Sequence, residues 1–261
     1  MKKTAIIGGG NLGTAIAEGL LKSGFCTADQ ITVTKRNTQT LGSLKERGIC
    51  IDPDNGKAVS ANEVIILAVK PFQAKEVLAE IKDSLSDKHI LISVVTGITL
   101  EEIQTTVGTN ITVFRAMPNT AIAIQQSMTC LSSVNAGEEQ KKYVAELFGT
   151  LGRVINIDEK LMNAATVLGA CGTAYAMRYI RANIQGGIEI GFDVVTASLI
   201  AAQTVKGAAD LLLSSNTHPE AEIDKVTTPR GCTIAGLNEM EHCGFSSSLI
   251  KGIAASYKKI G

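Results

Sequence analysis

The sequence has no excess of either charge and no long apolar run. Its 261 residues include 25 lysines and arginines together and 25 aspartates and glutamates, so no net field attracts the chain to nucleic acid or to an anionic membrane. No uninterrupted apolar segment is long enough to cross a bilayer, and Met1-Lys2-Lys3 leads into a short run that ends in glycines rather than into a signal-peptide core. We therefore expect a cytoplasmic protein, for which small charged substrates are still allowed.

The sequence also lacks metal-ligand patterns, heptads and internal repeats. No two cysteines form a C-x-x-C pair, and no histidine lies at metal-ligand spacing from one of them. The six cysteines are scattered along the chain: Cys26, Cys50, Cys130, Cys171, Cys232 and Cys243. We expect free thiols in a reducing compartment and no metal site.

An apolar run followed by a glycine motif stands at the start of the chain. Residues 4–7 lead directly into Gly8-x-Gly10-x-x-Gly13, and the apolar residues that follow recur at helical spacing: Leu12, Ile16, Leu20 and Leu21. This pattern predicts a strand, a tight turn and a helix. In such a unit the first glycine permits the turn, the second lets a pyrophosphate approach the backbone, and the third lets helix and strand pack. The helix N-terminus would bind the anion; the alternative is a purely structural glycine turn.

A second strand and its exit turn are predicted at residues 30–37, and they carry no carboxylate. An NAD-binding unit is expected to place an acidic residue about 20 residues beyond the glycines, where it holds the ribose 2′-hydroxyl. Here that window contains Thr34, Lys35, Arg36 and Asn37. Cations and small polar groups suit a 2′-phosphate, which favours NADPH over NADH. The alternative is that Lys35 and Arg36 are only solvated loop charges.

Strands and helices alternate up to about residue 158. The apolar run 64–69 predicts a parallel strand covered on both faces, and it stops at Lys70-Pro71, which places Lys70 at the carboxyl end, where such sheets bind ligands. Further strands are predicted at 89–95, 111–117, 127–132 and 153–157, and helices at 72–85, from Thr99 onward and near 137–151. The predicted fold class is α/β, with a Rossmann-type doubly wound sheet forming an NAD(P)-binding domain over residues 1–158.

Beyond Asp158 the strand pattern ends. Residues 161–190, 193–214 and 234–257 are rich in Ala, Leu, Ile and Met, so we expect an all-helical domain over residues 159–261 that binds substrate and forms a dimer. These helices carry apolar residues on more faces than one core needs. A second buried face indicates a partner subunit, and we predict at least an obligate homodimer.

A second site-forming stretch is Val226-Thr227-Thr228-Pro229-Arg230-Gly231-Cys232-Thr233-Ile234. It supplies hydroxyls, and its proline and glycine fix a tight turn just before an apolar helix. The backbone N–H groups of Gly231, Cys232 and Thr233 would lie at the helix N-terminus, where a carboxylate can bind. A simple capping turn is the alternative.

Over essentially its whole length the sequence resembles the pyrroline-5-carboxylate reductase family. The resemblance rests on the glycine loop, Ala68-Val69-Lys70-Pro71, Met117-Pro118-Asn119-Thr120, the stretch around Gly172-x-Ala174-Tyr175, His218-Pro219 and, most specifically, Val226-Thr227-Thr228-Pro229-x-Gly231-x-Thr233-Ile234. It implies reduction of 1-pyrroline-5-carboxylate to L-proline, the last step of proline biosynthesis, by hydride transfer from NADPH, with NADH possible. It also implies a homodimer with interlocked helical domains, or a higher homo-oligomer.

The resemblance further implies which residues form the sites. Residues matched to the cofactor pyrophosphate are Gly8, Gly10, Asn11, Leu12 and Gly13. Arg36 matches a position near the 2′-phosphate, Asn55 one on the adenosine side, and Asn119 one beside the nicotinamide. Around the nicotinamide ribose the matching residues are Ala68, Lys70 and Pro71. The loop that grips the substrate carboxylate and ring nitrogen, where two subunits interlock, is matched by Thr228, Gly231, Cys232 and Thr233.

Three departures from the family pattern put substrate affinity and selectivity in question more than the reaction class. The family's usual Ser-Gly-Ser-Gly-Pro-Ala-Tyr is here Gly169-Ala170-Cys171-Gly172-Thr173-Ala174-Tyr175, which removes two hydroxyls. The usual Pro-Gly-Gly is Pro229-Arg230-Gly231, which puts a side chain where glycine was free to take positive φ. Ala121 replaces a usual proline.

The expected mechanism needs few residues, because an imine can bind already protonated and the cofactor supplies the hydride. We expect Thr233 to hydrogen-bond the ring nitrogen as the catalytic residue. Tyr175 is either a substrate contact or a core residue, Lys70 is expected to be a binding cation, and the three histidines are expected to be structural. Two alternatives are another small imine or β-hydroxyacid reductase, for which Lys206 is the available helical lysine, and a dinucleotide-binding regulator without catalysis.

Overall fold

The computed structural model describes residues 2–260. Residues 2–171 together with Ile260 form one compact unit and residues 172–259 a second one, and each is described by itself. Among the described residues, none of the helices combines the length and apolar character that a bilayer-spanning segment needs.

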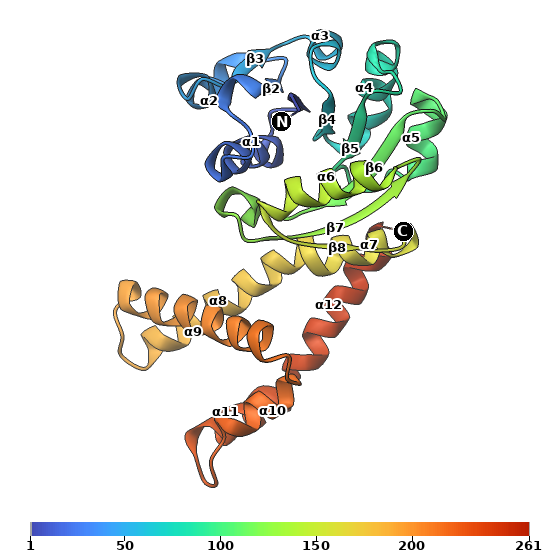
Figure 1. The fold of residues 1–261 in the computed structure, drawn as a ribbon. Helices are drawn as coiled ribbons and strands as arrows, with labels where there is room; N and C mark the ends of the chain where they lie inside the picture. The colour runs from blue at the N-terminus through green and yellow to red at the C-terminus, as the bar shows by residue number, and fades with distance from the viewer. Residues whose placement is uncertain (1, 261) are drawn as a thin grey trace. The chain divides into compact units, whose positions relative to one another are not determined.

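The first unit contains a twisted sheet (Figure 1). In the described part of the chain this sheet has eight strands. They are β1 (Thr4–Ile7), β2 (Ile31–Thr34), β3 (Cys50–Asp52), β4 (Val64–Leu67), β5 (Ile90–Ser93), β6 (Thr112–Met117), β7 (Ser127–Val134) and β8 (Gly152–Asn156). The spatial order is β3-β2-β1-β4-β5-β6-β7-β8. β1 to β6 are parallel, whereas β7 runs antiparallel to β6 and parallel to β8. The strand order reverses direction between β1 and β4, and ligands bind at such a switch point in open α/β sheets.

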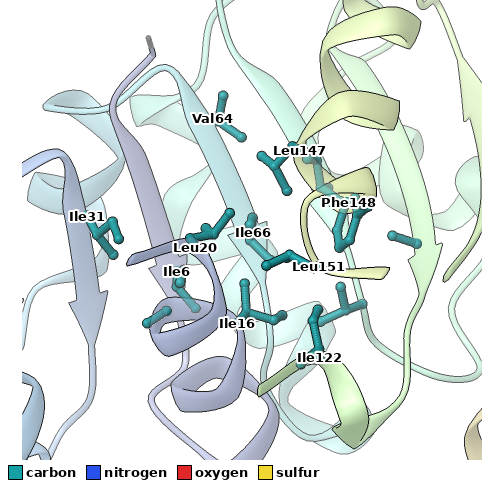
Figure 2. Close-up of a cluster of buried hydrophobic side chains, with 14 of the residues drawn as sticks. Ile6, Ile16, Leu20, Ile31, Val64, Ile66, Ile122, Leu147, Phe148 and Leu151 are labelled. Carbon is teal, nitrogen blue, oxygen red and sulfur yellow. The ribbon is translucent and has the colours of Figure 1, made fainter. Parts of the chain in front are cut away.

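Helices cover both faces of this sheet and complete two hydrophobic cores. The helices of this unit are α1 (Asn11–Ser23), α2 (Gly42–Glu46), α3 (Asn55–Ser60), α4 (Ala74–Ile81), α5 (Leu100–Val107), α6 (Glu138–Gly149) and α7 (Met162–Ala165). Figure 2 shows the core formed with α1 and α6, where Ile16 and Leu20 meet Leu147 and Phe148 over the sheet residues. The other core packs α3, α4 and α5 on the opposite side chains of the same strands. This alternation along each strand explains why the strands are apolar throughout, and the expected doubly wound α/β fold is confirmed.

Several elements differ from those expected. The sequence did not predict β3, α2 and α3, and the helix expected over 72–85 is α4 flanked by the 3-10 turns η3 (Pro71–Gln73) and η4 (Lys82–Ser84). The helix start at Thr99 is confirmed, since its hydroxyl accepts a hydrogen bond from the N–H of Glu102 and the Glu102 carboxylate accepts one from the N–H of Thr99. After β8 the chain continues through the 3-10 turn η6 (Glu159–Leu161), α7 and a π-helical turn, η7 (Thr166–Cys171).

The second unit is helical: α8 (Gly172–Glu189), α9 (Val194–Ser215), α10 (Pro219–Lys225), α11 (Cys232–His242) and α12 (Phe245–Ile260). The helical prediction over 234–257 is confirmed, but this stretch forms two helices, because α11 ends at His242 and the chain turns at Gly244, whose φ is +77°. The prediction also missed α10. Along α8 and α9 large apolar side chains are exposed, including Met177, Ile188, Val195, Leu199 and Leu211.

Candidate functional site

The glycine turn between β1 and α1 is closed by backbone contacts that leave little room for side chains. Gly8 has φ +115°, and a Cβ on it would lie 2.6 Å from the carbonyl oxygen of Ala68, the residue that follows the neighbouring strand β4. A Cβ on Gly13 would lie 2.0 Å from the carbonyl oxygen of Gly8. Around Gly10, in contrast, a Cβ would meet nothing within 4 Å. Two glycines are therefore required for packing, while the third keeps a face of the turn open.

The N-terminus of α1 is open to an anion. Gly10 caps the helix without a side-chain hydrogen bond, and the first turn carries no acidic residue. The first N–H groups of a helix have no acceptor within it, and the helix dipole places partial positive charge there. The N–H groups of Asn11, Leu12 and Gly13 are the ones concerned, and they make this end a suitable place for a phosphate.

A cavity of about 520 Å³ extends from this turn across the carboxyl ends of β1, β2 and β4. Most of the residues expected to bind the cofactor line it: Gly8, Gly10, Asn11, Leu12, Lys35, Arg36, Asn55, Ala68, Lys70 and Pro71. Gly13 is buried beneath the turn, and Asn119 is not among the lining residues. The structure therefore brings together, at the switch point, residues that lie as far apart in the sequence as Gly8 and Pro71.

Side chains at the β2 end of this cavity are joined by hydrogen bonds to α4. The Thr34 hydroxyl donates to Oδ1 of Asn55 at 2.6 Å, and Nδ2 of Asn55 donates to the Glu80 carboxylate at 3.2 Å. Nη2 of Arg36 lies 3.2 Å from Oε1 of Glu76. Sequence reasoning missed both glutamates, because nothing in their local pattern relates them to the end of β2.

Asn119 links two turns of the first unit. Its Oδ1 accepts a hydrogen bond from the N–H of Ala121 at 3.0 Å, which caps the 3-10 turn η5 (Thr120–Ile124), and its Nδ2 donates to the carbonyl oxygen of Gly169 at 3.2 Å. Gly169 lies in the π-helical turn η7, which the sequence did not predict. Such turns are frequent at functional sites.

The threonine-rich loop of the second unit ends in another uncapped helix. Gly231 is the N-cap of α11, and a Cβ on it would lie 2.5 Å from Oγ1 of Thr228, so the loop folds closely on itself. The first turn of α11 has no acidic residue and no side-chain cap. Cys232 is exposed and Thr233 half-buried at the start of this helix. The arrangement offers backbone N–H groups and a hydroxyl to a small anion.

Other residues that the sequence singled out have local partners. The Tyr175 hydroxyl and Oγ of Ser256 are 2.6 Å apart, His218 caps α10, and Nδ1 of His89 accepts from the N–H of Ser86. Lys70 is exposed and precedes η3. Among residues 2–260 no group of histidines, cysteines and acidic residues is placed to hold a metal ion.

Comparison with known proteins identifies the family. Residues 159–261 match the family model for pyrroline-5-carboxylate reductase dimerisation, and residues 3–97 match the model for NADP oxidoreductase, coenzyme F420-dependent. Pyrroline-5-carboxylate reductase 2 of Dictyostelium discoideum is 42% identical over 99% of this chain and 92% of its own length. The chain belongs to the pyrroline-5-carboxylate reductase family. Pyrroline-5-carboxylate reductase 1 of the same organism is 49% identical over 98% of this chain, which spans 48% of that protein.

Solved structures of the reductase family share the whole fold. The crystal structure of Plasmodium falciparum pyrroline carboxylate reductase with NADP bound has a TM-score of 0.90 and 26% identity, covering 99% of this chain and 96% of its own. The reductase from Coxiella burnetii has a TM-score of 0.89 and 30% identity, covering 99% and 97%. The expected Rossmann-type domain followed by a helical dimerisation domain is therefore that of the reductase family.

The first unit fits an NADP-type cofactor on its own geometry. The uncapped α1 N-terminus and the open face at Gly10 suit a pyrophosphate, while Lys35 and Arg36 line the cavity where an NAD-binding unit would place a carboxylate. The departure at Arg230 also has a structural consequence, because this residue has φ +61°. A non-glycine side chain is thus held in the left-handed region in the loop where the reductase family usually has glycine.

Proposed function

We propose that this chain reduces 1-pyrroline-5-carboxylate to L-proline with NADPH. The observation that carries the proposal is the Thr228–Thr233 loop, which has its two threonines and Gly231 at the uncapped start of α11, in a chain whose first unit has a cavity lined by most of the residues expected to bind the cofactor. A regulator without catalysis would have no need to keep this loop. Residues 1–158 are proposed to act as the NAD(P)-binding domain and residues 159–261 as the domain for substrate and dimer formation, in line with the family model over 159–261.

Residues of the first unit are proposed to hold the cofactor by its phosphates. The N–H groups at the start of α1 bind the pyrophosphate, and Lys35 and Arg36 bind the 2′-phosphate. Asn55 lies on the adenosine side. The groups proposed around the nicotinamide and its ribose are those of Ala68, Lys70, Pro71 and Asn119. When bound, the cofactor supplies the hydride.

The loop before α11 is proposed to hold the substrate. The N–H groups of Gly231, Cys232 and Thr233 bind the carboxylate, with the helix dipole favouring the negative charge. The Thr233 hydroxyl bonds the ring nitrogen and orients the iminium. No histidine or carboxylate is needed there as an acid, because the imine binds with its proton. Positioning of this kind supplies up to ~7–11 kcal/mol in the best intramolecular cases.

A homodimer formed through the helical domain follows from the apolar side chains that α8 and α9 leave exposed in the single chain, and we propose it as the working unit. A cytoplasmic location, suggested by the six free cysteines, is proposed as well. Size-exclusion chromatography with light scattering tests the homodimer, and cell fractionation tests the cytoplasmic location.

The reaction is tested by mixing purified protein with 1-pyrroline-5-carboxylate and following oxidation of NADPH, with NADH in parallel. Imine-dependent oxidation and formation of proline are expected, faster with NADPH. Binding of NADPH without oxidation would support the regulator instead. Oxidation only with a β-oxo acid, which such an enzyme reduces to the β-hydroxyacid, would support the other reductase, although Lys206 is paired with Asp210 one turn along α9. A panel of other cyclic imines distinguishes a changed substrate from lost catalysis.

A further inference from the structure

Helix α4 lies beside the cofactor cavity, with some residues that line the cavity and others that contact lining residues. Val77 lines the cavity, as does Gln73 just before the helix. The acidic residues Glu76 and Glu80, one helical turn apart, contact Arg36 and Asn55 respectively. The same helix therefore forms part of the wall and supplies carboxylates to two residues expected on the adenosine side.

The contact with Arg36 concerns the charge that a 2′-phosphate needs. Nη2 of Arg36 and Oε1 of Glu76 are 3.2 Å apart, and both side chains are largely exposed, at 80% and 67%. A phosphate that bonds this guanidinium must displace the Glu76 carboxylate or accept it as a like-charged neighbour. Lys35, in contrast, lines the same cavity without an ion-pair partner among residues 2–260.

A cofactor without the 2′-phosphate does not face this competition. NADH presents a ribose 2′-hydroxyl, which neither needs the Arg36 charge nor is repelled by a carboxylate. The Arg36–Glu76 pair therefore opposes the binding of NADPH and leaves that of NADH unaffected. Glu80 differs, because it is bonded to Asn55, on the part of the adenosine that both cofactors share.

We propose that Glu76 is a specificity-determining residue that lowers the preference for NADPH over NADH by neutralising Arg36. The inference rests on the proposed use of NADPH. It assigns to α4 a role in cofactor choice beyond that of a wall of the cavity.

The test is titration of the full-length protein with NADPH and with NADH, followed by fluorescence of the reduced nicotinamide. Glu76→Gln is expected to tighten NADPH binding by about two- to fivefold, the factor that corresponds to one exposed ion pair, and to leave NADH binding unchanged. The gain should shrink at high salt, which screens exposed charges. In an Arg36→Leu background, adding Glu76→Gln should change the ratio of the two affinities less than in the parent, because no guanidinium remains to be neutralised.

Two matched variants are the controls. Glu80→Gln removes a carboxylate from the same helix without touching Arg36, and Glu146→Gln removes one that pairs with Lys142 on α6; neither should change the ratio of affinities. An unchanged ratio in Glu76→Gln, or an equal change in Glu80→Gln, would overturn the inference. Because binding is measured without the imine, a protein that binds NADPH but fails to reduce 1-pyrroline-5-carboxylate would refute the proposed function and leave this inference standing. Failure to bind either cofactor would overturn both.

Discussion

Arg115 is a buried cation whose charge is balanced by one carboxylate. Its side chain on β6 is 4% exposed, and its Nη1 donates to Oε1 of Glu159 at 3.0 Å. The same oxygen accepts a hydrogen bond from the N–H of Leu100 at 2.6 Å, at the start of α5. Within the described residues Nε of Arg115 is buried without a hydrogen-bond partner. Glu159 thus joins the sheet, the start of α5 and the segment after β8.

Replacing Glu159 should change the free energy of unfolding much more than replacing Arg115. Glu159→Ala leaves the buried guanidinium without its counter-charge, and breaking a buried pair in this way costs roughly 3–5 kcal/mol. Glu159 is itself 30% exposed, so water can partly replace it, and we expect about 3 kcal/mol, the lower end of that range. Arg115→Met removes the charge that needs a partner and leaves Glu159 bonded to Leu100 and reached by water. We expect that variant to lie within about 1 kcal/mol of the parent.

Urea denaturation at a fixed protein concentration measures both variants, because subunit association otherwise shifts the apparent stability. In a thermal melt Glu159→Ala should lower Tm by roughly 6–12 °C. The double variant should resemble Arg115→Met alone, and Glu138→Ala, which breaks an exposed pair with Lys141 on α6, should resemble the parent. The reasoning is refuted if Arg115→Met is less stable than Glu159→Ala, or if both equal the parent.

Three further predictions concern the two proposed sites. Thr233→Ala should lower kcat by about one to three orders of magnitude without changing NADPH affinity, because one positioned donor in a dry site is worth roughly 2–4 kcal/mol; unchanged turnover would remove its catalytic role. Gly10→Ala should keep the parent's Tm but bind NADPH at least about tenfold more weakly, since its methyl group enters the open face used by the pyrophosphate. Gly13→Ala, in contrast, should lower Tm because its Cβ would lie 2.0 Å from the carbonyl oxygen of Gly8. Equal Tm values for the two variants would contradict this reasoning. Arg230→Gly should raise the free energy of unfolding by up to about 1 kcal/mol, because glycine relieves the left-handed backbone. If the exposed guanidinium binds the substrate carboxylate, KM for the imine should rise about two- to fivefold in this variant. An unchanged KM would show that the Arg230 side chain only lies at the surface.

The sequence predicted elements wherever a periodic pattern or a local motif decides the structure. The turn from β1 to α1 follows from its glycine spacing, and Thr99 with Glu102 marks the start of α5 because a capping box needs only four consecutive residues. β3 was missed because it has only three residues, with a polar end at Asp52. The break between α11 and α12 at Gly244 was not predicted, because apolar residues on both sides continue a helical pattern.

Much of the candidate site could not be predicted, because it depends on tertiary contacts. Glu76 is 40 positions from Arg36 and Glu80 is 25 positions from Asn55, and each pair meets only because the turn after β2 and the start of α3 fold against α4. A charge on an exposed helix face carries no local sign of its partner. Resemblance to a family supplies the positions that contact the cofactor but not the side chains that compete for those positions.

The π-helical turn shows why side-chain departures from a family pattern need not disturb a contact. Gly169 stands where the family usually has serine, and the hydroxyl is lost. Asn119, however, donates to the carbonyl oxygen of Gly169, which any residue would provide. The link between η5 and η7 is thus independent of the side chain at position 169. Arg230 is the opposite case, because its φ of +61° puts the substitution into the backbone itself. A change of substrate selectivity in this chain is therefore to be sought first at Arg230, at the turn that precedes α11, and only then in the π-helical turn.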